Sequence, residues 1–118
     1  MSTLTLSKLT GIAYVTDSVT ALFTNPAATT SYVRLIVLYN GNATSENIKV
    51  YNVPNNGGAV GTAGTANAFE NLTLVANDTA LLEFSGPGLV LTDQNDSIQG
   101  SATLASGVTI QIMGAQEA

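Results

Sequence analysis

The chain has 118 residues, of which 45% are hydrophobic, and its three basic and eight acidic side chains give a formal net charge of -5. This length suits one domain with a single core, and the apolar content excludes intrinsic disorder. The negative charge argues against partners such as nucleic acids or anionic membranes, because both attract basic surfaces.

Cys, His and Trp are absent from the sequence. Their absence removes thiolate and imidazole nucleophiles, the commonest metal ligands and all disulfides, so we expect no cofactor and no metal. The first residues contain no long apolar run, so they do not resemble a secretory signal. The longest apolar run, 33–39, is interrupted by Arg34 and is too short to span a bilayer.

Short β-branched segments alternate with Gly, Asn and Pro along the chain, which is typical of an all-β sandwich or barrel. We predict about eight strands and little or no helix. The segments with strand character are 3–6, 20–24, 32–40, 47–53, 71–77, 79–85, 89–91, 97–105 and 108–114. The predicted fold is a single antiparallel β-sandwich, jelly-roll-like or immunoglobulin-like, over residues 11–118.

Three details of this prediction concern how the segments pair. Segment 32–40 is almost continuously apolar, which predicts a central strand with both faces covered. The spacing across 40–47 predicts an antiparallel hairpin with segment 47–53. Segment 54–71 shows no clear period before Phe69, so we expect a structureless loop or wide excursion, and this segment is the first candidate for partner contact, with 54–68 as a natural bridging loop.

The N-terminal segment 1–10 leaves two alternatives open. Leu4 and Leu6 alternate with polar residues and need an apolar surface to cover them. Either the segment completes the sheet of its own domain, or it is an extended arm that pairs with a neighbouring subunit. The candidate residues for contact with a partner or with another copy are Leu4, Leu6, Leu9, Tyr39, Tyr51 and Phe69.

Asp93 and Asp96, within "LVLTDQNDSIQG", form the nearest approach to an acidic cluster. We interpret them as the polar turn of a β-hairpin, because Asp and Asn side chains hydrogen-bond nearby backbone N–H groups. A structural cation is the alternative, but a calcium loop needs six or more oxygens and a terminal bidentate Glu. A catalytic pair is the least favoured reading.

The remaining chemistry is sparse. The carboxylates Glu46, Glu70, Asp78 and Glu83 are scattered, and no Trp is present to stack on sugars. With His absent, a serine nucleophile would depend on Lys8 or Lys49 as its base, and no motif supports such a pair. We therefore expect a protein that is not an enzyme.

The chain from Tyr32 onward carries a pattern of strands and turns. Its residues are Leu38-Tyr39-Asn40, Val53-Pro54, Gly57-Gly58, Leu89 and Leu91, Asp96, Ile98, Gly114 and Glu117. The pattern resembles a loose group of small virion proteins of tailed bacteriophages. The N-terminal third carries no part of it, so it gives no expectation for how that part attaches.

The resemblance implies a non-enzymatic β-sandwich that stabilises a virion, such as a capsid decoration (cement) protein bound to the major capsid protein. It also implies a homo-oligomer, by analogy a trimer, located on the capsid surface after synthesis in the host cytoplasm. The alternatives are a tail or baseplate component, or a carbohydrate- or receptor-binding module. In the last case Tyr14, Tyr32 or Tyr51 would be the stacking platform.

Overall fold

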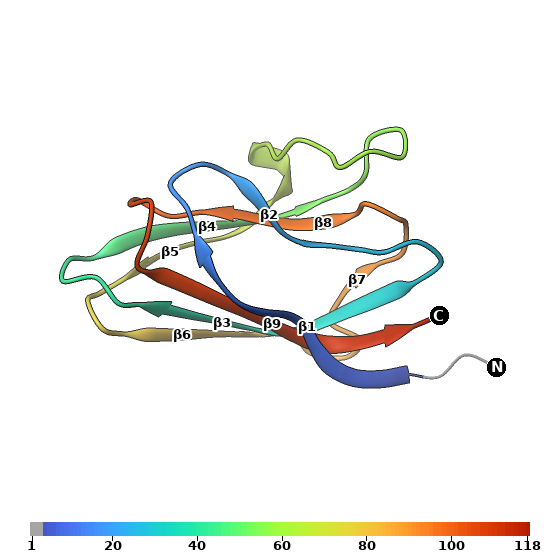
Figure 1. Ribbon diagram of the computed structural model, residues 1–118, viewed down its shortest axis with the longest axis horizontal. Coiled ribbons are helices and arrows are strands. Elements are labelled where there is room, and N and C mark those ends of the chain that lie inside the picture. The colour runs from blue at the N-terminus through green and yellow to red at the C-terminus, as the bar shows by residue number, and fades with distance from the viewer. Residues whose placement is uncertain (1–3) are drawn as a thin grey trace.

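The computed structural model describes the backbone of residues 4–118 and side chains from Lys8 onward. The fold is all-β and consists of two packed antiparallel sheets (Figure 1). The elements, in chain order, are β1 (Leu4–Val15), β2 (Thr20–Thr24), β3 (Thr30–Asn40), β4 (Glu46–Val53), η1 (Thr65–Asn67), β5 (Ala68–Leu74), β6 (Thr79–Glu83), β7 (Leu89–Leu91), β8 (Ser97–Ser101) and β9 (Val108–Glu117).

The strand order is that of a jelly roll. The five-stranded sheet has the order β1-β9-β3-β6, with β7 also paired to β3, and the four-stranded sheet has the order β2-β8-β4-β5. The pairs are nested along the chain, β1 with β9, β2 with β8, β3 with β6 and β7, and β4 with β5. The predicted β-sandwich is confirmed, and of its two variants the jelly-roll-like one matches this order.

The core lies between the two sheets and is built from the inward-facing residues of their strands. In β9, the inward residues Val108, Ile110 and Ile112 are buried, and the residues between them are half-buried, as the alternation predicts. β3 supplies Val33, Ile36 and Leu38 from the same sheet. The facing sheet contributes the buried residues Phe23, Ile48, Val50, Leu74 and Ile98.

Both predicted hairpins are instead connections between the two sheets. β3 and β4 lie in different sheets, so the hairpin predicted across 40–47 is wrong. β7 and β8 also lie in different sheets, so the bend at Asp93 to Asp96 is a turn but not a hairpin. Among the described strands, β4 and β5 are consecutive and hydrogen-bonded, and the loop 54–67 connects them.

That loop is shaped by contacts rather than structureless. It contains the 3-10 turn η1 and a β-bridge between Asn56 and Ala59. The side chain of Gln99 donates to the carbonyl of Gly61 at 2.9 Å, and that of Asn95 donates to the carbonyl of Gly58 at 2.7 Å. The loop therefore lies over the outer side of the four-stranded sheet (Figure 1).

The prediction that both faces of segment 32–40 are covered is wrong for the single chain. β3 is central in its sheet, between β9 on one side and β6 and β7 on the other. Its inner face is buried, but on the outer face Leu35 and Val37 are half-buried and Tyr39 is exposed. The apolar run is therefore covered by its own chain on one side only.

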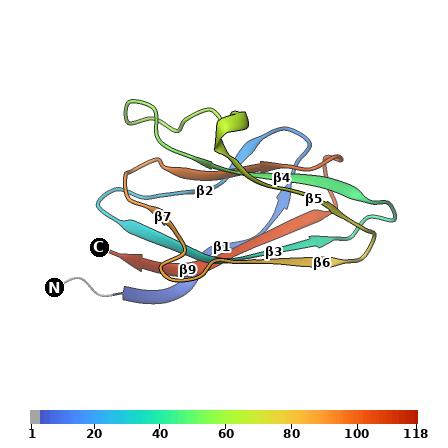
Figure 2. The same ribbon diagram turned by 180° about the vertical axis from the view of Figure 1, so that it is seen from behind.

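The N-terminal segment pairs with β9 of its own chain, which is the first of the two alternatives. The register places Leu4 opposite Glu117 and Val15 opposite Val108, so one strand, β1, crosses the boundary expected at residue 10, although its register with β9 shifts on both sides of Thr10 (Figure 2). The side chains of Leu4 and Leu6 lie outside the described residues. Exchange of this segment between subunits stays a prediction.

Candidate interaction surface and the polar network of the loops

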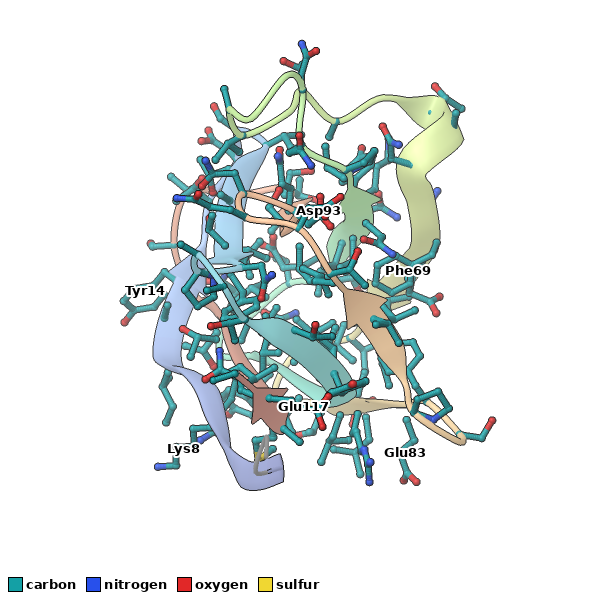
Figure 3. All side chains as sticks on the ribbon, turned by 90° about the vertical axis from the view of Figure 1, so that its right-hand side faces the viewer. Lys8, Tyr14, Phe69, Glu83, Asp93 and Glu117 are labelled. Atoms are coloured by element: carbon teal, nitrogen blue, oxygen red, sulfur yellow. The ribbon has the colours of Figure 1, made fainter. Side chains whose placement is uncertain are left out.

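Asp96 holds together the bend that follows β7. Its carboxylate accepts hydrogen bonds from the backbone N–H of Asn55 at 2.9 Å, and from the Asn55 side chain and the Asp93 backbone at 3.0 Å each. Asn95 completes the turn with a φ of 69°. The Asp93 side chain is exposed, and its backbone makes the contacts (Figure 3). The bend is thus a turn that also fixes the start of the loop 54–67.

The environment of Asp96 favours its charged form. Burial alone would raise the pKa of this carboxyl, but hydrogen bonds from Asn55, Asp93 and the backbone of Thr92 outweigh burial and lower the pKa below its ordinary value. Hydrogen bonds donated to a carboxylate stabilise its ionised state. The folded bend therefore favours the charged form of Asp96, and this charged form stabilises the bend.

Asn25 connects the same bend to the turn between β2 and β3. Its side chain is buried, donating to the carbonyls of Thr29 at 2.7 Å and Asp93 at 3.0 Å, and accepting from the hydroxyl of Ser31 at 2.6 Å. One side chain therefore satisfies three groups from segments far apart in the sequence. The predicted strand 20–24 ends just before Asn25, and the sequence indicated no role for this residue.

A second polar cluster stabilises the opposite end of the sandwich. Glu46 is fully buried, with 0% exposed surface, and its two oxygens accept from the backbone N–H of Leu104 and the side chain of Asn42, each at 3.0 Å. Asn42 also donates to the carbonyl of Ser106 at 2.9 Å. Beside it, the buried Asn40 side chain donates to the carbonyl of Leu74 at 2.9 Å.

These clusters give structural roles to two of the carboxylates that the sequence offered as candidates for chemistry. Asp96 and Glu46 use their oxygens to bind N–H groups of loops. The part of the chain that the structure describes holds no group of three or more His, Cys, Asp or Glu side chains arranged for a metal ion. Within the same residues, no helix is long and apolar enough to cross a membrane.

The predicted contact residues do not come together. Leu9 is half-buried against the core, and Phe69 packs edge-to-face on Phe84 with the ring centroids 5.8 Å apart. Tyr51 lies in the four-stranded sheet, opposite Gln99 and Ala68. Tyr39 lies in the other sheet and is exposed. Leu4 and Leu6 have side chains outside the described residues.

The tyrosines of the sugar-stacking alternative are also dispersed. Tyr14 is exposed on β1, whereas Tyr32 lies on β3 and donates its hydroxyl to Glu117 at 3.2 Å. That hydrogen bond, with burial and the carboxylate charge, raises the pKa of Tyr32. Tyr51 belongs to the opposite sheet, so the three rings form no common platform.

One surface does collect apolar side chains, and we call it the outer face: the side of the five-stranded sheet that points away from the core. Strand pairing aligns its residues in rows, because residues directly opposite in antiparallel strands share a face. One row contains Tyr14, Thr109, Tyr39 and Thr79, and the next contains Gln111, Val37 and Leu81. A third row contains Lys8, Met113, Leu35 and Glu83.

The outer face is both apolar and open. Tyr14 is 62% exposed and Leu81 is 58% exposed, with Val37 half-buried between Gln111 and Leu81. Val90, which pairs with Tyr32, extends the exposed apolar surface toward β7. The sequence predicted this apolar run as a central strand with both of its faces covered.

The outer side of the four-stranded sheet is different. Ser97 and Gln99 are buried there beneath the loop 54–67, which reaches Gln99 through Gly61. Further along, Asn47 and Lys49 are exposed and polar. The outer side of the four-stranded sheet is therefore polar and partly covered by the loop 54–67. The outer face of the five-stranded sheet is apolar and exposed.

Comparison of the chain with protein-family models, with curated proteins and with solved structures gives no match.

Proposed function

We propose that the protein is a non-enzymatic structural component of a tailed-bacteriophage virion, a capsid decoration protein that binds the major capsid protein and stabilises the head shell. The observation that carries this proposal is the contrast between the polar side chains, which are used in internal hydrogen bonds, and the apolar side chains, which are exposed on the outer face. The carboxylates of Asp96 and Glu46 bind loop backbone, and the open surface is an apolar sheet face. Such a molecule is suited to adhesion.

The pattern shared with small virion proteins falls on residues that organise the fold. Asn40 and Asp96 are centres of the two polar clusters, and Gly114 lies where β9 and β3 change register. The pattern thus describes a framework of strands and turns, which supports a structural role. Jelly rolls occur in viral capsid proteins and also in lectins, so the fold supports the proposal without deciding it.

In this role the protein acts as a homo-oligomer on the capsid surface, after synthesis in the host cytoplasm. A repeated shell presents many copies of the same site, so weak individual contacts gain from multivalency. A trimer would suit a three-fold position of the shell by analogy. The loop 54–67 is the candidate for contact with the major capsid protein, because it projects from the four-stranded sheet (Figure 2).

Gold-labelled antibody against the protein, applied to virions produced from the genome that encodes it, tests the proposal. Label over the heads, together with loss of heat stability in heads that lack the protein, is the expected result. Label confined to tails would replace the decoration role with the tail or baseplate alternative. Virions without label would contradict a structural role in the particle.

A further inference from the structure

The outer face of the five-stranded sheet lacks the cover that its sequence calls for. β3 is apolar on both sides, yet among the described residues the chain covers only the inner side. We propose that a second copy of this chain packs on the outer face in a two-fold dimer, with Lys8 of each copy facing Glu83 of the other. This inference does not depend on the proposed virion role.

The row of Lys8, Met113, Leu35 and Glu83 carries the inference. The lysine is on β1 at one edge of the row, the glutamate on β6 at the other, and two apolar residues lie between them. Figure 3 shows Lys8 and Glu83 at opposite edges of the five-stranded sheet, pointing away from the body of the molecule. Three strand spacings separate them, about 14 Å, which is too far for an ion pair within one chain.

A two-fold axis brings these charges together. If the axis runs along the strands between β9 and β3, each row faces the same row of the second copy in reverse order. Lys8 then faces Glu83 of the second copy twice per dimer, and Met113 faces Leu35. In the neighbouring rows Gln111 faces Val37, and Tyr14 faces Thr79. Each charged residue at the edge of the row therefore faces a residue of opposite charge, and the apolar residues Met113 and Leu35 face each other between them.

The angle at which packed sheets usually cross still leaves Lys8 within reach of Glu83 of the second copy. Aligned sheets cross at about 30°, and the charges lie about 7 Å from the axis, so the crossing displaces them by about 4 Å. A lysine side chain spans that displacement.

The charge distribution of the molecule favours this face for self-association. The strands of the five-stranded sheet carry two basic residues, Lys8 and Arg34, and two acidic ones, Glu83 and Glu117. The rest of the chain carries the other six acidic residues and one basic residue, which together make up the net charge of -5. Two copies that meet through this sheet thus avoid the repulsion that other surfaces would produce.

A second copy fits these observations better than another occupant, because the face is complementary to itself. A trimer around a three-fold axis would not oppose one row to the same row, so it would leave both charges without their predicted partners. Trimerisation by analogy and the two-fold pair are therefore distinguishable by measurement.

Sedimentation of the purified chain over a concentration series tests the dimer. We expect a monomer–dimer equilibrium that Leu81→Lys shifts at least about tenfold toward monomer, because it inserts a charge into the middle row of the interface. Val75→Lys is the matched control, since Val75 is 54% exposed against 58% for Leu81 but lies outside the strands of the outer face. Circular dichroism melts establish that both variants are folded.

Charge reversal provides a second test that needs no change in the apolar residues. Lys8→Glu alone and Glu83→Lys alone should each weaken the dimer about tenfold or more, because each creates two like-charge contacts. Mixing the two single variants should restore dimers, since both contacts in the mixed pair again join opposite charges. Nonspecific apolar association would not give this recovery.

A strict monomer, a trimer, or a dimer that Leu81→Lys leaves unchanged would each overturn the inference. So would charge-reversed variants that fail to recover on mixing. These measurements use the chain alone, so a monomer would remove the dimer while leaving head binding to be decided by the labelling of virions.

Discussion

At the scale of the residue, buried and half-buried polar side chains organise the loops of this molecule. Asn25, Asn40, Glu46 and Asp96 each bind groups from two or more segments that are distant in sequence. A buried polar group is costly unless hydrogen-bonded, and each of these has its partners. Removing one partner leaves another group unsatisfied, so single substitutions here should have measurable effects.

Asp96→Asn should lower the free energy of unfolding at neutral pH by about 1–3 kcal/mol, because an amide in place of the carboxylate loses one acceptor and the charge. The folded-state pKa of Asp96 is lowered, so its contribution exists above the unfolded pKa and is lost as the pH falls through the folded pKa. Urea denaturation from pH 7 down to about pH 3 measures the difference.

That difference between wild type and variant should shrink as the pH falls below the ordinary carboxyl range, about 4. Asp93→Asn is the control, since the exposed Asp93 side chain leaves the backbone contacts of the bend intact. A difference that stays constant with pH would show that the charge of Asp96 does not stabilise the bend.

Glu46→Gln should destabilise the protein by about 1–3 kcal/mol, because one carboxylate oxygen becomes an NH2 group facing a donor. The affected donor is either the N–H of Leu104 or the side chain of Asn42. Thermal unfolding compared with Glu70→Gln, a substitution on β5 outside this cluster, gives the measurement. Equal melting temperatures for both variants would contradict a structural role for the buried carboxylate.

At the scale of the element, strand positions were largely predictable, whereas sheet membership was not. The segment 20–24 is a strand with the expected bounds, and the alternation in β9 is confirmed. Periodicity reports which residues share a face, but the turns after Asn40 and Asn77 do not reveal whether the next strand stays in the sheet. In a jelly roll that choice depends on pairing with distant strands.

The register change between β9 and β3 depends on a glycine. A Cβ at Gly114 would collide with the backbone carbonyl of Tyr32, and neither backbone can yield without disturbing the sheet. Gly114→Ala should therefore destabilise the protein by more than about 3 kcal/mol or prevent folding. Gly11→Ala on β1 is the control, because its Cβ would meet nothing within 4 Å. Similar denaturation midpoints for the two variants would contradict this account.

At the scale of the whole molecule, nearly every sheet contact joins segments distant in sequence. β1 and β9, which lie at opposite ends of the chain, are paired along most of their length. The apolar run of β3 signalled that both of its faces need cover, but a single sequence cannot say which chain provides it. The buried clusters were less visible, because Asn and Glu at strand ends read as ordinary turn residues.

This topology should make folding slow. Closing long loops has an entropic cost that must be met before distant strands pair, so all-β proteins of this kind fold in milliseconds to seconds. Stopped-flow refolding from urea, followed by tyrosine fluorescence, measures the rate. Complete recovery of the signal within microseconds would show that local contacts dominate instead.

The pairing of Leu4 with Glu117 has a consequence for how this molecule can be joined to others. Both described ends of the chain leave the sandwich at the same pole, and the turn holding Glu46 lies at the opposite one (Figure 1). Peptides fused to either end would therefore emerge side by side. A short linker between the ends would also allow new termini in the loop 54–67, turning the domain into a scaffold for circular permutation and display.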